Sequence, residues 1–372
     1  MPTTDLLQQA RRMMVICNWC RYCEGFCAVF PAMILRRDFP DPDLKYLANL
    51  CHNCRDCYYA CQYAPPHTFA VNVPKTFAEL RLSTYRDFTW PGFLAGLFHR
   101  NGRAVAWITS SSTAILFLLA MVWAGPATVF SAHLGPDAFY EVIPRRMIIL
   151  PASFLGLYSI TALLMGLAAF WRETGGHAGE LMDLRAHACA ARDVLQLKYL
   201  DGGGFGCNYP DARFSRLRRW FHHLVFYGFM LCFAATTVAG IYDHFPGWKA
   251  PYPFWSWPVV LGTAGGSSLL IGSGALIYLK RRMDPAPAAS LSFGMDMGFL
   301  AQLFLTALTG LLLLALRETP AMGTLLIAHL GLVTGLFISL PYGKSVHAIY
   351  RYAALVRNAI EKFREETQIK KV

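Results

Sequence analysis

The sequence predicts a mainly α integral membrane protein, a six-helix bundle preceded by a small helical N-terminal domain. Two four-cysteine runs lie within the first 61 residues, and six long apolar segments follow them. Of the 372 residues, 55% are hydrophobic and only 15% are charged. An apolar segment of about 20 residues can cross the hydrocarbon core of a bilayer as a helix. We therefore expect an N-terminal domain over residues 1–103 and a membrane domain over residues 104–372.

Both cysteine runs have the spacing C-x2-C-x2-C-x3-C, which is that of bacterial two-cluster ferredoxins. Three cysteines of a run then bind one [4Fe-4S] cluster, and the fourth binds the other cluster. Zinc sites usually use cysteine pairs, and residues 1–15 contain no secretory signal that would favour disulfides. Ala28 and Gln62 stand where the ferredoxin motif has proline. We expect one site from Cys17, Cys20, Cys23 and Cys61, and the other from Cys51, Cys54, Cys57 and Cys27.

Helices and spans are predicted from the apolar pattern in chain order. Leu6–Ile16 and Asp43–Leu50 are each expected to form a helix that leads into a cysteine run. A polar insertion over residues 172–220 separates the second span from the third, and an amphipathic tail over residues 345–366 is expected to continue the last helix. The spans are expected at residues 104–123, 148–171, 221–242, 258–279, 295–316 and 321–340.

The distribution of positive charge predicts the membrane topology. With these spans, 30 of the 34 Lys and Arg residues fall on one side. The positive-inside rule then places both termini in the cytoplasm, as in a multi-pass protein of a bacterial inner membrane. The net charge of +11 is thus explained by topology, and we expect no nucleic-acid partner. The residues opposite are Arg145, Arg146, Lys249 and Arg317.

The insertion contains three successive glycines at residues 202–204. Glycine lacks a Cβ, so such a stretch suits either a mobile turn or close approach by a partner or ligand. The sequence leaves both interpretations open. The spacing does not match a nucleotide-binding loop, because no strand precedes it.

Histidines in or beside the spans are candidate ligands of haem b, because an ionisable residue within a membrane usually has a function. His329 and His347 are eighteen residues apart, which is five helical turns or about 27 Å on one continuous helix. We expect His222 or His223 to pair with His347 for an inner haem, and His244 to pair with His329 for an outer one. The sequence predicts one or two haems; interfacial histidines facing lipid phosphates are the alternative for residues 222 and 223.

The whole chain resembles the tricarballylate/citrate utilization protein B family. The resemblance rests on the twin cysteine runs, the six spans and three motifs: Tyr199 to Pro210 (YLDGGGFGCNYP), Arg218 to Leu224 (RRWFHHL) and Gly247 to Tyr252 (GWKAPY). It implies a membrane electron-transfer protein whose partner is a separate FAD-containing tricarballylate dehydrogenase on the cytoplasmic face. A relative is fused to a flavoprotein of cobalamin synthesis, so the resemblance leaves the identity of the flavoprotein open.

More distantly, spans three to six resemble the haem b subunit of respiratory nitrate reductase, in which one helix also carries two ligands five turns apart. The facing helix of that cytochrome carries a second histidine about three turns after the first. In this chain the corresponding region, near Cys232 and Phe233, has none. This difference bears on the outer haem alone.

The sequence therefore predicts a redox relay that passes electrons from a reduced flavoprotein through two [4Fe-4S] clusters and haem b to quinone. We expect no catalytic acid, base or nucleophile in this chain. The alternatives are a quinone-linked subunit of a heterodisulfide-reductase-like or other flavoprotein complex, and a haem-based sensor. This sequence has no cysteine-rich catalytic domain of the heterodisulfide reductase type, which argues against catalysis by this chain alone.

Overall fold

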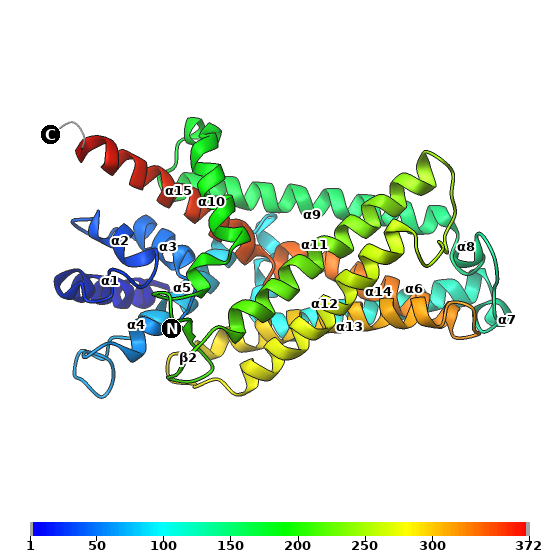
Figure 1. The fold of residues 1–372 in the computed structure, drawn as a ribbon, viewed down its shortest axis with the longest axis horizontal. Coiled ribbons are helices and arrows are strands. Elements are labelled where there is room, and N and C mark those ends of the chain that lie inside the picture. The colour runs from blue at the N-terminus through cyan, green and yellow to red at the C-terminus, as the bar shows by residue number, and fades with distance from the viewer. Residues whose placement is uncertain (1–2, 370–372) are drawn as a thin grey trace.

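The computed structural model describes residues 3–369 and is almost wholly helical (Figure 1). The N-terminal part is a cluster of short helices, which we call the head. Its helices pack around the two cysteine runs at one end of the molecule, where both ends of the described chain also lie. They are α1 (Thr3–Cys20), α2 (Val29–Ile34), α3 (Asp41–Leu50), α4 (Asp56–Tyr59), α5 (Val73–Asp87) and η1 (Gly92–Phe98).

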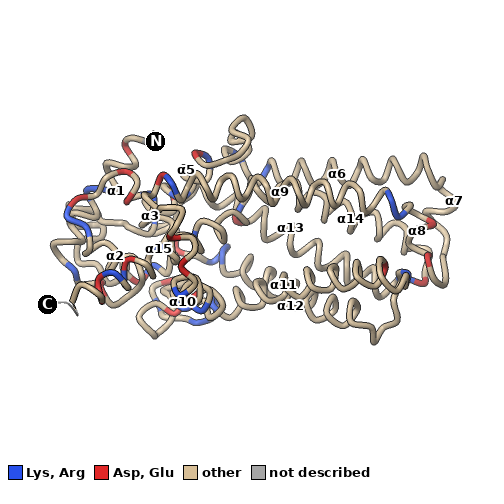
Figure 2. Tube along the Cα trace, turned by 90° about the horizontal axis from the view of Figure 1, so that it is seen from above, with Lys and Arg blue, Asp and Glu red and all other residues tan. Residues whose placement is uncertain are grey.

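Six helices of the described chain are long and apolar enough to cross a membrane, so the predicted multi-pass architecture is confirmed. Their middle parts are almost free of charge, and Lys, Arg, Asp and Glu gather near the two ends of the bundle (Figure 2). At the end far from the head, α7 (Pro126–Val129) and α8 (Ala138–Val142) connect the first two spans. The spans are α6 (Asn101–Trp123), α9 (Arg145–Glu173), α11 (Leu217–His244), α12 (Trp257–Arg281), α13 (Ser290–Ala315) and α14 (Met322–Ser339).

The C-terminal helix α15 (Val346–Ile369) belongs structurally to the head. It packs against α3, α9 and α10 (Leu184–Leu195). Arg36 bonds Glu361 at 2.6 Å, and the rings of Tyr85 and Tyr350 stack with centroids 5.7 Å apart. The head is therefore built from three separated stretches of chain, and residues 1–103 supply only the first.

The predicted continuous helix through the last span and the tail is wrong. Helix α14 ends at Ser339, the short turn η4 (Leu340–Tyr342) follows, and α15 starts at Val346. Pro341 has no backbone N–H for a helical hydrogen bond, and Gly343 has an extended backbone with φ −138° and ψ −162°. His329 and His347 consequently lie on different helices, and the five-turn spacing does not fix their relative orientation.

The insertion packs onto the head next to the second cysteine run. It contains η2 (Ala178–Met182), α10, η3 (Lys198–Leu200) and one antiparallel pair, β1 (Cys207–Asn208) and β2 (Phe214–Ser215). Asp56 accepts a hydrogen bond from the backbone N–H of Asn208 at 3.0 Å. A Cβ at Gly202 would lie 1.9 Å from Oδ2 of Asp56. The close approach observed here is to the head of the same chain, and not to a partner or ligand.

Candidate functional site

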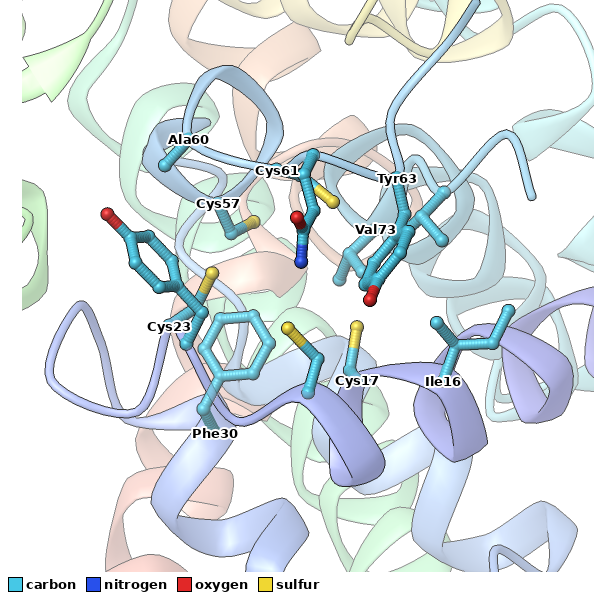
Figure 3. Close-up of a pocket in the computed structure, with 13 residues that line it drawn as sticks. Ile16, Cys17, Cys23, Phe30, Cys57, Ala60, Cys61, Tyr63 and Val73 are labelled. Carbon is cyan, nitrogen blue, oxygen red and sulfur yellow. The ribbon is translucent and has the colours of Figure 1, made fainter. Parts of the chain in front are cut away.

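Four cysteines predicted to share a site line one cavity of about 180 Å³, which we call the first cavity. Cys17 and Cys20 lie in the last turn of α1, Cys23 follows in the next loop, and Cys61 comes from the second run. Cys57 also lines this cavity. The sulfur atoms of Cys17, Cys23, Cys57 and Cys61 point toward a common space (Figure 3). Cys20 is exposed, so this cavity opens toward the surface.

The other four predicted ligands line a second, smaller cavity of about 10 Å³, the second cavity. Cys51 caps the end of α3, Cys57 lies in α4, and Cys27 comes from the first run. Because Cys57 lines both cavities, the two sites are neighbours. The structure thus brings the fourth cysteine of each run to the opposite site.

The chemistry of these thiols fits metal clusters. Burial, followed by the charges of Cys61 and Cys20, raises the pKa of Cys17 to about 12. Burial and the charge of Cys51 similarly raise the pKa of Cys27 to about 12. So many crowded thiols can all be thiolates only if cations lie among them. Within residues 3–369, no three His, Cys, Asp or Glu side chains lie close enough together to bind a single metal ion. A [4Fe-4S] cluster is larger than one ion, so its four cysteine ligands lie further apart.

Three arginines converge on the backbone at the second cavity. Arg81 donates hydrogen bonds to the carbonyl oxygens of Ala48 at 2.8 Å and Cys51 at 2.9 Å. Arg351 donates to the same Cys51 oxygen at 3.0 Å. Arg218 donates to the carbonyl of Asn53 at 2.6 Å. The three guanidinium groups come from α5, α15 and α11, so they tie one membrane span and the C-terminal helix to the second cysteine run.

His222 and His347 face each other across the junction between α11 and α15. Their ring centroids are 6.4 Å apart. The ring planes meet at 74°, and at this separation both rings could reach one metal ion with bonds of about 2 Å. Nδ1 of His347 donates to the carbonyl of Lys344, which leaves its Nε2 lone pair available. Nδ1 of His222 is buried without a hydrogen-bond partner among the described residues.

This pair could hold a haem iron, which takes neutral imidazoles as ligands. Burial and the nearby Arg351 lower the pKa of His347, which favours the neutral imidazole that a metal requires. Arg218 precedes His222 by four residues, and Arg351 follows His347 by four, so each arginine lies one turn from its histidine. Helices α11 and α15 therefore each connect one histidine of the pair to the backbone at the second cavity.

The structure does not bring together the other predicted histidines. His223 turns toward Trp220 and Tyr227, with centroid distances of 6.0 and 5.8 Å. His329 lies against α13, where Nδ1 donates to the carbonyl of Thr306 at 3.1 Å, and a Cβ at Gly310 would lie 2.9 Å from its ring. His244 is exposed at the end of α11, and no ring contact joins it to His329 in the described chain.

The arginines were missed by the sequence reasoning, which considered only cysteines and histidines as functional residues. One signal was present. Arg218 and His222 have the same four-residue separation as His347 and Arg351, in opposite chain order. Since the two helices run in opposite directions relative to the head, this mirrored spacing places each arginine at the head side of its histidine. His52, between two of the cysteines, donates from Nδ1 to the carbonyl of Leu50 at 2.8 Å.

Comparisons with known proteins agree over nearly the full length. The family model described as Citrate utilization protein B matches residues 100–368. The model described as Citrate utilization protein B Fer4-like domain matches residues 10–87, which hold both cysteine runs. Over 365 residues the chain is 47% identical to Citrate utilization protein B of Escherichia coli, covering 97% of this chain and 94% of that protein. No solved structure matches the chain. The similarity and the clustered cysteines together indicate an iron–sulfur membrane protein.

Proposed function

Because this chain belongs to the citrate utilization protein B family, we propose that it is a membrane-bound electron-transfer protein that reoxidises an FAD-dependent tricarballylate dehydrogenase. In this proposal the head faces the cytoplasm of a bacterium, the spans lie in the inner membrane, and quinone is the final acceptor. Iron–sulfur clusters and haem b supply one-electron redox chemistry when they are bound. A two-electron flavin and a two-electron quinone can then be coupled by single-electron steps.

In this proposal, separate sets of cysteines and histidines bind the clusters and the haem. One [4Fe-4S] cluster is assigned to Cys17, Cys20, Cys23 and Cys61, and the other to Cys27, Cys51, Cys54 and Cys57. One haem b is assigned to His222 and His347. The outer pair, His244 and His329, stays a prediction that the arrangement of α11 and α14 does not favour.

The observation that carries the proposal is the connection between the head and the histidine pair. Arg218 and Arg351 each lie one helical turn from a paired histidine, and both bond carbonyl oxygens within residues 51–53. Electrons pass only between redox centres that lie close together. A cluster in the head can therefore deliver electrons to the membrane domain only if it lies next to a redox centre of that domain. This connection supports a route from the second cavity to the span bundle.

Electron entry is best supported at the first cavity. Tyr22, which lines it, is 69% exposed, and Trp19 beside the exposed Cys20 is 88% exposed. Large exposed aromatic side chains on a soluble surface are typical of protein-binding sites. We assign this surface to the flavoprotein.

Reconstitution in liposomes that contain menaquinone or ubiquinone tests the proposal. We expect the optical band of reduced haem to appear only when the flavoprotein and tricarballylate are both present, and we expect quinol to accumulate. A preparation without haem, or haem that dithionite reduces but the flavoprotein with its substrate does not, would contradict the proposed function.

A further inference from the structure

We propose that buried arginines raise the reduction potential of the cluster at the second cavity above that of the cluster at the first. Electrons that enter the head would then collect beside the histidine pair. This inference rests on the proposed function, because it assumes a [4Fe-4S] cluster at each cavity. It concerns how the chain's own residues make the two sites different and set the direction of electron flow.

The positive charge at the second cavity has few anionic partners. The Arg81 side chain is 6% exposed and Arg55, within the second run, is 1% exposed. No salt bridge within residues 3–369 involves Arg55, Arg81, Arg218 or Arg351. Arg55 instead lies over the ring of Tyr209 at 4.7 Å. A buried cation without an anion is costly, so this cluster indicates that an anionic group belongs beside it.

The carboxylates near the arginines do not balance them. Asp56 is buried and accepts the N–H of Asn208, and the carboxylate of Asp284, near Arg55, accepts the Tyr59 hydroxyl at 2.6 Å. These are two negative charges beside four guanidinium groups. Asp296 is already paired with Lys280 at 2.6 Å and with Lys344 at 2.7 Å. A [4Fe-4S] core bound by four thiolates is net negative in both of its oxidation states, and more negative after reduction. It therefore supplies the missing anion at the place where the guanidinium groups converge.

The first cavity has a different environment. In the described part of the chain, Arg21 is the one guanidinium that bonds a backbone carbonyl within residues 17–27, at 3.0 Å from Asn18. Arg21 and Cys20 are both exposed, so water screens that charge. Cluster potentials depend on net charge, hydrogen bonding and exposure, and buried positive charge favours the reduced form. One electron consequently moves from the first site to the second, with no bond made or broken.

Redox titration of the purified full-length protein, followed by electron paramagnetic resonance, tests this. We expect two cluster midpoint potentials. Arg351→Gln and Arg81→Gln should each lower the higher potential by at least a tenfold change in equilibrium constant, or 59 mV for one electron. Arg351→Lys keeps the charge and should retain most of the potential. Arg21→Gln, which removes the exposed arginine of the first run, should leave the higher potential unchanged.

The outcomes separate this inference from the proposed function. Two clusters with equal potentials would overturn the inference alone. So would Gln variants that shift the lower potential, or that shift the haem potential and neither cluster. A preparation with far less iron than two clusters require would overturn the proposed function and this inference with it. Iron quantification before titration distinguishes these cases, and it also identifies an Arg81 variant that has failed to assemble.

Discussion

The two cavities of the head are lined by cysteine runs of identical spacing, but they differ in exposure and in the charged side chains around them. The first has a volume of about 180 Å³ and opens beside the exposed Cys20, whereas the second is about 10 Å³ and is lined by the buried Cys51 and Cys54. Three arginines from separated helices bond the backbone of the second run, and one exposed arginine bonds that of the first. The cysteine spacing is the same in both runs, so the difference between the two cavities comes from the side chains that surround them.

The largest effect is expected from removing a ligand. Cys54→Ser should abolish one cluster signal and reduce bound iron by about half, because a cube of this type uses four cysteine ligands. Cys232→Ser, a cysteine in α11 that packs near Gly265, is the matched control and should retain all the iron. Iron analysis and electron paramagnetic resonance measure both. Full iron content in the Cys54 variant would refute the assignment of the second cavity.

The histidine pair is the next largest test, because it compares two adjacent residues. His347→Ala and His222→Ala should each lose haem, since bis-histidine binding needs both rings. His223→Ala should retain it, because His223 turns toward Trp220 and Tyr227. Pyridine-haem quantification of the purified variants measures the result. Loss of haem in His223→Ala together with retention in His222→Ala would reverse the assignment.

The glycine stretch tests how the insertion packs against the second cysteine run. Gly202 has φ +54°, and a Cβ there would meet the Asp56 carboxylate. Gly202→Ala should lower stability by about 1–3 kcal/mol through backbone strain and this clash, and should make the second cluster more labile than the first. In the control Gly203→Ala, the nearest side-chain atom is 3.8 Å away, on Phe26. Thermal unfolding followed by near-ultraviolet circular dichroism compares them. Equal melting temperatures of the two variants would show that the close packing of Gly202 against Asp56 does not contribute to stability.

The smallest effect is expected at the surface of the first cavity. Trp19→Ala should raise the KM for the flavoprotein severalfold with little change in kcat, because it removes exposed contact area and no ligand. Met182→Ala, an equally exposed apolar residue on the insertion, should leave both constants unchanged. Steady-state quinone reduction with varied flavoprotein gives the two constants. A larger loss in the Met182 variant would move the docking surface to the insertion.

The spans and the cysteine sets could be predicted because their signals are local. A span is an uninterrupted apolar stretch, and the cysteine spacing predicts the two groups that line the neighbouring cavities. The break after Ser339 was missed, although Pro341 and Gly343 were visible, because the apolar pattern continues up to Leu340. That break invalidated the helical reasoning that placed His329 and His347 on one face.

The arginines at the second cavity could not be predicted in the same way. Arg81, Arg218 and Arg351 come from three helices that are far apart in sequence, and they meet only because α5, α11 and α15 come together beside the second cysteine run. Basic residues near spans are usually explained by topology, and that explanation concealed their second role. Hydrogen bonds to backbone carbonyl oxygens of residues 48–53 distinguish these three from the other positive residues on the same side.

The central claim is that charge passes from the head to the histidine pair through the second cavity. Stopped-flow spectroscopy of haem reduction, started by the flavoprotein and tricarballylate, tests it in the wild-type protein and in Cys54→Ser. We predict that the variant keeps its haem, that dithionite reduces this haem, and that the flavoprotein with its substrate does not. Haem reduction in Cys54→Ser at the wild-type rate would contradict the account.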